Sequence, residues 1–418
     1  MTYHSDSPDA THFDALETRA AEDRETELMD AVRAQVAHAR ASTEAFASSL
    51  VDLDIGQLAA REDLAAIPVT RKSRLIGLQG QAPPFGGLTA APLAEMGRVF
   101  QSPGPIYEPQ ARRADYWRMA RALFAAGIRP GDLVHNTFSY HFTPAGSMME
   151  SGADALGCTV FPAGVGQTEL QVGAIADLRP RAYVGTPSFL DIILQKADEL
   201  GKNLDSIQNA LVSGEALPNA LRERFRARGI QVLQAYATAD LGLIAYETPA
   251  LDGMVCDEQV LVEIVRPGTD EPVAEGVVGE VVVTTLNPDY PLIRFGTGDL
   301  SAVLPGASSC GRTNMRIRGW LGRADQTTKV RGMFVHPEQV EEVVRRHPEI
   351  RQARLVVSNP DQRDQMTLCC DLGETAPDLL DHIAATVREV TKLRAQVVPA
   401  DERLPNDGKV IDDQRNYD

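Results

Sequence analysis

The sequence lacks the features that mark membrane and secreted proteins. No apolar run approaches the roughly 20 residues that a membrane-spanning helix needs. The first residues are polar and acidic, unlike the basic and then apolar start of a signal peptide. The five cysteines form no C-x-x-C pair, and so sparse and odd a number indicates reduced thiols. These absences predict a cytoplasmic protein with no membrane partner.

Positive charge is also scarce. The 418 residues include 41 Lys and Arg against 58 Asp and Glu, a net charge of -17. An acidic surface argues against binding to nucleic acid or to anionic membranes, because both are polyanions. It does not argue against a small anionic substrate, since a local pocket can be basic inside an acidic envelope. We therefore expect small-molecule ligands and no nucleic-acid partner.

The length and the pattern of the chain predict two or three domains of a globular protein. Residues 12–66 have helical spacing. From residue 116, short apolar runs that end in Gly or Pro alternate with helical stretches, which indicates parallel strands. Residues 255–304 have the pattern of antiparallel strands. We predict an α/β fold: an N-terminal domain over 1–322, with a β-rich part at about 255–320, and a mobile α+β domain over 323–418.

Two glycine-punctuated strings lie between Pro291 and Gly332. The first, RFGTGDL, holds Asp299, whose carboxylate can accept hydrogen bonds from the two hydroxyls of a ribose; the alternative is a β-turn with an Asx bond. The second, GRADQTTKVRG, holds Arg323, whose planar guanidinium suits anions, and Asp325, where the two predicted domains join. The alternative for this string is a charged surface linker.

Three further strings contain candidate residues. In LVSGEAL, small residues let a flat ring lie against the backbone, or they form an ordinary strand-to-helix turn. In AYATADLG, Tyr236 can stack on adenine and Asp240 can hold Mg²⁺; the alternatives are a core tyrosine and a helix-capping aspartate. In RLPNDGKV, Lys409 follows a tight turn and can reach developing negative charge, or it is an exposed tail lysine.

The order of these strings resembles that of adenylate-forming enzymes, the acyl-CoA synthetase or AMP-binding superfamily. That family has Gly-Glu-Pro/Ala, then Tyr-Gly-x-Thr/Ser-Glu, Tyr/Arg-x-Thr-Gly-Asp, Gly-Arg-x-Asp and a C-terminal Gly-Lys. The early string LAAIPVTRKSRL and the string TPSF also resemble phenylacetate-CoA ligases, and the resemblance covers roughly residues 60–415. It implies a homodimeric ligase that activates a carboxylic acid with ATP and Mg²⁺ and transfers the acyl group from AMP to coenzyme A.

The resemblance also implies a role for each candidate residue. Those expected on the adenine side are Gly214, Glu215, Ala216, Ala237 and Tyr236, with Tyr236 stacked on the ring. Those expected farther along the nucleotide are Asp299 on the ribose, Arg323 on the nucleotide and Asp240 on Mg²⁺. Those expected to serve the catalytic cycle are Lys409, which bridges carboxylate and α-phosphate, the hinge Asp325, and Gly332 beside pantetheine.

The phosphate loop departs from the family pattern Ser-Ser-Gly-Thr-Thr-Gly-Lys-Pro. The matching string here is SPGPIYEP, in which Ser102, Gly104 and the last proline fit. Two other prolines have no N–H to donate, and Glu108 replaces the lysine. A carboxylate beside triphosphate costs about one to a few kcal/mol, or roughly tenfold in affinity. Three explanations stay open: a rebuilt loop that binds ATP, a slow enzyme or one with another phosphate donor, or a ligand-binding protein without full catalysis.

The string AYATADLG, which contains Tyr236, also departs from the family pattern. Ala237 replaces a glycine, Ala239 replaces a hydroxyl residue, and Asp240 is one methylene shorter than glutamate.

Some relatives also carry a structural zinc held by Cys and His. Here only Cys256 and Cys310 lie in the matching regions, fewer than the four ligands of a closed site, so we expect two reduced cysteines.

The acyl group is expected beside Tyr140, His141 and Phe142, which give an aromatic, weakly polar wall; aromatic residues are alternatively part of the core. The family suggests an aryl or arylacetic acid. We thus predict an ATP-dependent acid:CoA ligase of the phenylacetate type. The alternative is a degenerate nucleotide- or CoA-binding homologue with little or no ligase activity. A further possibility is transfer to a carrier protein that docks on the arginines of ALRERFRARG, which alternatively form a solvated helix face.

Overall fold

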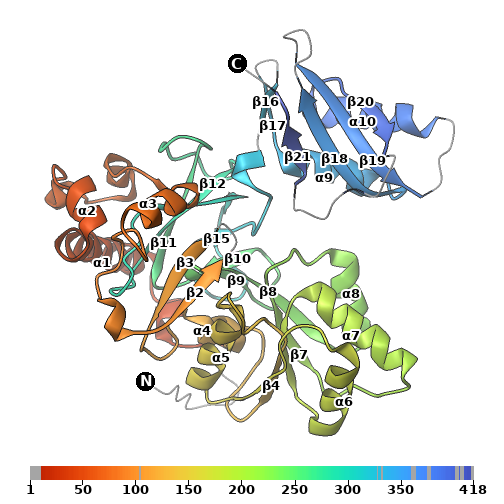
Figure 1. The fold of residues 1–418 in the computed structure, drawn as a ribbon, viewed down its shortest axis with the longest axis horizontal. Helices are drawn as coiled ribbons and strands as arrows, with labels where there is room; N and C mark the ends of the chain where they lie inside the picture. The colour runs from red at the N-terminus through yellow and green to blue at the C-terminus, as the bar shows by residue number, and fades with distance from the viewer. Residues whose placement is uncertain are drawn as a thin grey trace.

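The protein has an N-terminal part built on two large sheets and a smaller C-terminal part (Figure 1). The computed structural model describes residues 11–102, 105–326, 328–330, 333–358, 364–373, 378–400, 404 and 409–415. No helix in this described part of the chain has both the length and the apolar character that a bilayer crossing requires.

A nine-stranded sheet with the order β14-β15-β10-β9-β8-β7-β6-β4-β5 forms the centre of the N-terminal part. Its parallel strands are β4 (Leu133–Asn136), β5 (Thr159–Pro162), β6 (Ala182–Gly185), β7 (Asn209–Val212) and β8 (Gln231–Thr238). Its remaining strands are β9 (Gly242–Glu247), β10 (Met254–Cys256), β14 (Val303–Leu304) and β15 (Arg316–Ile317). Strand direction reverses after β8, because β9 pairs with β8 in antiparallel register.

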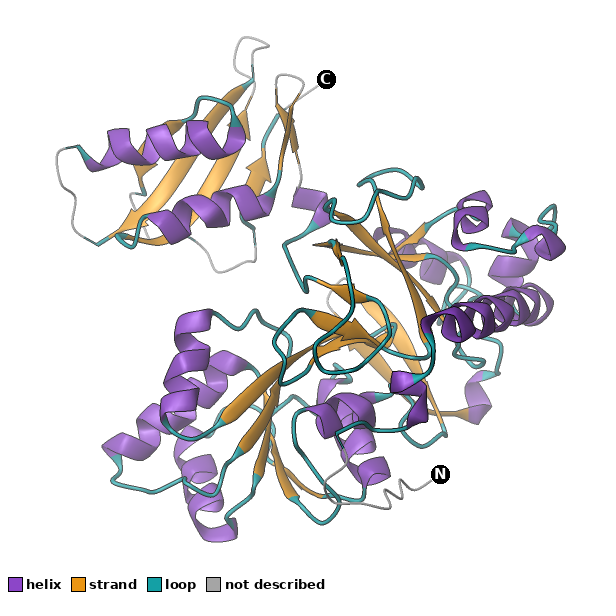
Figure 2. Ribbon diagram, turned by 180° about the vertical axis from the view of Figure 1, so that it is seen from behind, coloured by secondary structure: helices purple, strands orange, loops and turns teal. Residues whose placement is uncertain are grey.

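Helices cover both faces of the parallel strands (Figure 2). The crossover helices are α5 (Ala145–Leu156), α6 (Thr168–Leu178), α7 (Pro187–Glu199) and α8 (Asn219–Ala227), and α4 (Met119–Ala125) precedes β4. Successive strand residues point to opposite faces. In β6, Val184 therefore packs in the cluster of α4 and α5, whereas Tyr183 packs in the cluster of α6, α7 and α8.

The second sheet has the order β1-β13-β12-β11, and its strand β13 carries the first glycine-punctuated string, RFGTGDL. Its strands are β1 (Thr70–Arg71), β11 (Val260–Val265), β12 (Gly279–Thr285) and β13 (Phe295–Ser301). A separate hairpin pairs β2 (Met96–Ser102) with β3 (Ile106–Ala111). The N-terminal helices are α1 (Ala21–Ser42), α2 (Glu44–Ser49) and α3 (Leu75–Gln81). Leu28, Val32 and Val36 recur at helical spacing and bury one side of α1 in the cluster that includes β11 and β12.

The C-terminal part is a four-stranded sheet with the order β20-β19-β18-β21, with two helices packed side by side on one face (Figure 2). Its elements are β16 (Thr328–Val330), β17 (Met333–Val335), α9 (Pro337–Arg346), β18 (Ile350–Ser358), β19 (Gln365–Leu372), α10 (Leu379–Thr391), β20 (Gln396–Pro399) and β21 (Ile411–Asp413). A short 3-10 turn, η6 (Ala324–Gln326), precedes β16.

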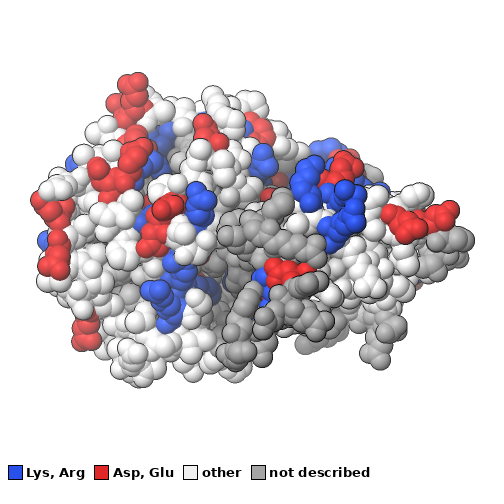
Figure 3. Space-filling view, turned by 90° about the horizontal axis from the view of Figure 1, so that it is seen from above, with Lys and Arg blue, Asp and Glu red and all other residues white. Residues whose placement is uncertain are grey.

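The observed architecture confirms the predicted fold class: an α/β N-terminal part with an antiparallel region, followed by a small α+β unit. The division of the chain into 1–322 and 323–418 stays a prediction. Charged side chains of both signs are interspersed on the face shown in Figure 3, without a continuous basic area there.

Candidate active site

A cavity of about 260 Å³ lies where the nine-stranded sheet meets the glycine-rich strand β13. Six predicted residues from three separate segments line it: Gly214, Glu215, Ala216, Tyr236, Ala237 and Asp299. The segments after β7 and at the end of β8 lie at the carboxyl ends of parallel strands, where ligands bind in such sheets. The fold therefore brings the predicted adenine-side and ribose-side residues to one place, and their roles stay predictions.

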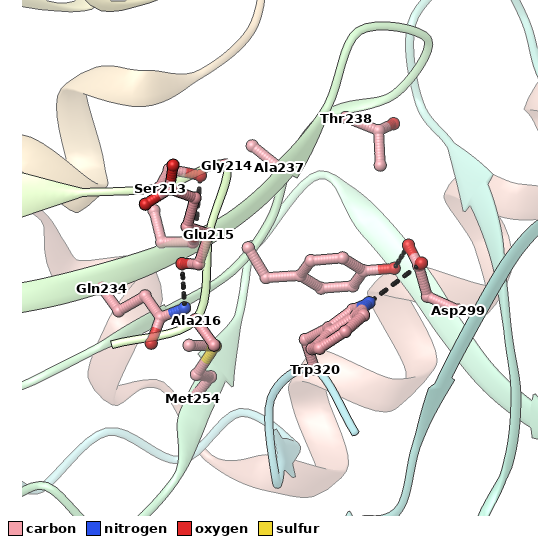
Figure 4. A pocket seen from close by; sticks show the side chains of 12 residues that line it. Ser213, Gly214, Glu215, Ala216, Gln234, Ala237, Thr238, Met254, Asp299 and Trp320 are labelled. Atoms are coloured by element: carbon pink, nitrogen blue, oxygen red, sulfur yellow. Dashed lines mark hydrogen bonds between the residues drawn. The ribbon is translucent and has the colours of Figure 1, made fainter. Parts of the chain in front are cut away.

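The turn after β7 is fixed by backbone and side-chain contacts. Ser213 Oγ donates to the carbonyl of Ala235 at 2.8 Å, which ties this turn to β8. Gly214 has φ +80°, a conformation that glycine adopts without strain. The Nε2 of Gln234 donates to the carbonyl of Glu215 at 3.1 Å (Figure 4). These bonds hold one wall of the cavity.

Asp299 is the most heavily bonded side chain in the cavity. Its Oδ2 accepts from the hydroxyl of Tyr236 at 2.9 Å, and its Oδ1 accepts from Trp320 Nε1 at 3.1 Å and from Arg323 Nη1 at 3.2 Å. Figure 4 shows the nitrogen of the Trp320 ring directed at the carboxylate of Asp299. Burial, and then the charge of Asp299, raises the pKa of Tyr236 well above its usual value, so the phenol stays protonated and donates.

A close approach of Arg323 explains the glycine before Asp299. A Cβ on Gly298 would lie 2.8 Å from Arg323 Nη2, and the φ of Gly298 is +76°. The backbones of Asp299 and Arg323 also form a β-bridge, which brings the two predicted strings together. Trp320 was not predicted; the signal was its position in WLGR, directly before the second string.

Asp240 lies in the turn between β8 and β9 and is 6% exposed. Its Oδ2 accepts from Lys72 Nζ at 2.5 Å, and its buried Oδ1 has no hydrogen-bond partner among the described residues. Lys72 follows β1, which pairs with β13. Lys72 was not predicted as a site residue, although the string LAAIPVTRKSRL that contains it carried part of the resemblance.

Glu108 points into the protein from β3, in the hairpin of β2 and β3 that contains the predicted phosphate loop and is called the phosphate-loop hairpin below. It is 0% exposed, and Ser102 Oγ donates to its Oε1. Burial is the largest cause that raises the pKa of Glu108 to about 7, followed by the charge of Asp240, whereas Ser102 and Lys72 lower it. The predicted residue Gly104 lies outside the described residues. The loop string therefore includes a buried carboxyl group rather than an exposed one.

The residues of the predicted acyl wall are not among those that line this cavity. Tyr140 is half-buried, with its hydroxyl accepting from Asn136 Nδ2 at 2.9 Å, and burial raises its pKa. His141 is exposed, and Phe142 is 76% exposed with φ 60°. The carbonyl of Phe142 accepts from the backbone N–H of Gln101 in β2 at 2.8 Å, so this segment lies against the phosphate-loop hairpin. The substrate-binding roles of the three residues stay predictions.

The residues predicted to act in the catalytic cycle belong to the C-terminal part and to residues 323–326, which precede it and are called the connector below. Asp325 lies in the turn η6, and Gly332 lies outside the described residues. Lys409 Nζ lies 3.4 Å from Asp412 Oδ1, with the lysine side chain 55% exposed. The neighbouring Gln326 accepts from the N–H groups of Val410 and Ile411 at 2.6 and 3.2 Å, which joins the connector to β21.

Cys256 and Cys310, which lie in the regions that hold a zinc site in some relatives, are next to hydrogen-bonding groups. Ser308 Oγ lies 3.0 Å from Cys310 Sγ, and Asn314 Nδ2 donates to the carbonyl of Cys256 at 2.9 Å. Burial raises the pKa of Cys310, but hydrogen bonds from Ser308 and Arg312 outweigh it and lower the pKa below its usual value. Within the described ranges no three His, Cys, Asp or Glu side chains are grouped as metal ligands.

Comparisons with known proteins place this geometry in a class. The model of the "AMP-binding enzyme" family matches residues 113–287. A phenylacetate-coenzyme A ligase of Thermus thermophilus is 32% identical over 82% of this chain and 78% of its own. The phenylacetate-coenzyme A ligase of Aromatoleum evansii is 31% identical over 75% of this chain and 73% of its own. The chain therefore belongs to the AMP-binding, adenylate-forming superfamily, as a phenylacetate-CoA ligase-like member of its acid:CoA ligases.

The fold comparison agrees with this assignment. The solved structure of an open conformation of a 2-hydroxyisobutyryl-CoA ligase, in complex with 2-HIB-AMP and CoA, matches with a TM-score of 0.84. The match covers 98% of this chain and 95% of that one at 24% identity, so it shows a shared fold.

Proposed function

We propose that the protein is an ATP-dependent acid:CoA ligase that activates an aryl or arylacetic acid such as phenylacetate. The main observation in support of this proposal is the cavity that is lined by Tyr236, Asp299 and the turn at Gly214. In this proposal the acid and ATP give acyl-AMP and pyrophosphate, and the thiol of CoA then displaces AMP to form the thioester. The phenylacetate-CoA ligases at 32% and 31% identity support the class of acid.

The bonds of Asp299 suggest how a nucleotide would be received. A carboxylate has about four lone-pair positions, and three described side chains already donate to this one. Two ribose hydroxyls therefore require that one present donor leave. Arg323 is the donor best suited to do so, since its side chain is 36% exposed and its guanidinium can turn to a phosphate. We propose that Arg323 exchanges Asp299 for the nucleotide on binding.

Asp240 fits a divalent cation, because its buried Oδ1 lacks a partner among the described residues. Mg²⁺ in such sites offsets the charge of phosphate oxygens. In the same proposal Lys409 approaches the α-phosphate for adenylation, the C-terminal domain turns about Asp325, and Gly332 lies along the path of pantetheine. Tyr140, His141 and Phe142 face the acyl group, and the enzyme is a homodimer.

The test is release of pyrophosphate from MgATP with a panel of aryl and arylacetic acids, with and without CoA. The expected result is acid-dependent pyrophosphate release, and thioester formation only when CoA is present. Absence of release with every acid, from protein shown to be folded by circular dichroism, would sink the proposal.

A second candidate is a degenerate homologue that binds nucleotide or CoA without turnover. The specific observation in its favour is Glu108, a buried carboxyl group where the family has the phosphate-loop lysine. Calorimetry with ATP, AMP and CoA separates the two candidates. Binding of AMP or CoA without binding of MgATP would favour the second.

The carrier-protein variant of the reaction has less support. The arginines considered for docking lie on or just after α8, and each has an acidic partner: Arg222 with Glu247, Arg224 with Asp191, Arg226 with Glu223 and Arg228 with Asp198. A surface whose cations are already paired attracts an acidic protein less strongly, so CoA is the preferred acceptor.

A further inference from the structure

Three buried polar atoms near the phosphate-loop hairpin have no hydrogen-bond partner among the described residues. They are Glu108 Oε2, Asp240 Oδ1 and the hydroxyl oxygen of Tyr290. The exposed fractions of these residues are 0%, 6% and 1%. Buried polar groups are nearly always bonded, and an unbonded one needs a cause such as a bound ion or an ordered water. Three such atoms in one region point to a ligand-binding role.

The three side chains share one electrostatic neighbourhood although they come from different elements. Glu108 is on β3, Asp240 follows β8 and Tyr290 precedes β13. After burial itself, the charges of Asp240 and Glu108 are the next causes that raise the pKa of Tyr290. Lys72 Nζ bonds the other oxygen of Asp240, and Ser102 bonds the other oxygen of Glu108. Each carboxyl group is thus held by one oxygen, and its second oxygen has no hydrogen-bond partner among the residues that the structure describes.

We infer that Glu108 and Asp240 together hold the divalent cation that accompanies ATP, through Glu108 Oε2 and Asp240 Oδ1. The inference rests on the proposed function, because phosphate oxygens and water must complete the coordination. Mg²⁺ is often bound in this way, by one or two carboxylates plus substrate phosphates.

The inference explains the most conspicuous departure from the family pattern. Replacement of lysine by Glu108 changes the charge at this point by two units, from positive to negative. A divalent cation bound by Glu108 returns two positive charges to the same place. The loop then binds triphosphate through a metal ion where other members use an ammonium group, and the repulsion expected from a carboxylate beside phosphate becomes a metal-bridged contact.

The test measures binding of Mn²⁺ to the full chain by the EPR signal of free Mn²⁺, alone and with a nonhydrolysable ATP analogue. The variant Glu108→Gln keeps the shape and the acceptor for Ser102 but removes the charge. We expect it to weaken Mn²⁺ binding in the nucleotide complex by tenfold or more, since even loss of an outer-shell partner costs about 10–100-fold. The matched control Glu271→Gln makes the same chemical change at an exposed position and should bind like the wild type.

A second variant keeps the inference falsifiable if Glu108→Gln does not fold. Glu108→Lys restores the family residue, and its nucleotide affinity should depend less on Mn²⁺ than that of the wild type. Mn²⁺ affinity equal to wild type in Glu108→Gln would overturn the inference. Failure of the proposed function is distinguishable: calorimetry would then detect no nucleotide binding to the wild type. Absence of nucleotide binding would overturn the proposed function and this inference with it, whereas nucleotide binding with equal Mn²⁺ affinity in wild type and Glu108→Gln would overturn the inference alone.

Discussion

At the scale of single residues, Asp299 connects the two glycine-punctuated strings. It receives the phenol of Tyr236, the indole of Trp320 and the guanidinium of Arg323. Tyr236 therefore has two tasks that can be separated experimentally. Its ring lines the cavity, and its hydroxyl orients the carboxylate that is proposed to hold the ribose.

Replacing Tyr236 with Phe tests this division. The ring remains for stacking, but Asp299 loses one donor to a charged group. We expect AMP binding to weaken by about tenfold, or about 1.4 kcal/mol, measured by calorimetry. A variant that binds AMP as tightly as wild type would show that the hydroxyl does not position Asp299.

The sequence allowed part of this site to be predicted. Asp299, Tyr236 and the turn at Gly214 lie in strings whose order resembled a family, and the structure places them around one cavity. Lys72 escaped prediction because its approach to Asp240 depends on the parallel pairing of β1 with β13. The inward direction of Glu108 depends on its pairing opposite Phe100 in a hairpin, which a string with three prolines does not indicate.

At the scale of elements, the glycines of strands and helices differ in the room that the surrounding atoms leave for a side chain. Gly185 ends β6, where an added Cβ would lie 2.0 Å from Thr137 Oγ1 and 2.3 Å from the hydroxyl of Tyr183. Both neighbours are buried, so neither can move away easily. Gly173, within α6, has open space where its Cβ would be.

These two glycines form a matched pair for substitution by alanine. Gly185→Ala should lower the free energy of unfolding by about 1–3 kcal/mol or more through overpacking. Gly173→Ala should raise it by roughly 0.5–1 kcal/mol, because alanine favours a helix interior. Urea denaturation measures both, and a stable Gly185→Ala protein would contradict the packing described for β6.

Asp115 provides a pH test at the start of α4. It accepts from the backbone N–H of Ala120 at 3.2 Å, and burial raises its pKa to about 7. The folded protein therefore binds a proton more tightly than the unfolded chain between about pH 4 and pH 7, so this residue lowers stability as the pH rises through that range. Relative to Asp115→Asn, the wild type should lose about 4 kcal/mol between pH 4 and pH 8. If the free energies of unfolding of the two proteins changed with pH in the same way, the raised pKa would be contradicted.

At the scale of the whole molecule, the proposed cycle requires two placements of the C-terminal part. Lys409 is bonded within its own sheet and does not line the cavity, so adenylation needs it to approach. Lys409→Ala should reduce acid-dependent pyrophosphate release by about 10²–10³, as for loss of one electrostatic contact to a transition state. Thioester formation from supplied acyl-AMP should change little. Equal loss in both half-reactions would contradict a role confined to adenylation.

The connector is fixed on both sides. Arg323 forms a backbone bridge with Asp299 in the N-terminal part, and Gln326 is bonded to Val410 and Ile411 in the C-terminal part. Any rotation that preserves these contacts is therefore confined to the torsions between the backbone of Arg323 and the side-chain amide of Gln326. So short a pivot would let the two halves of the reaction differ by a rotation of the C-terminal part about one point, with little translation.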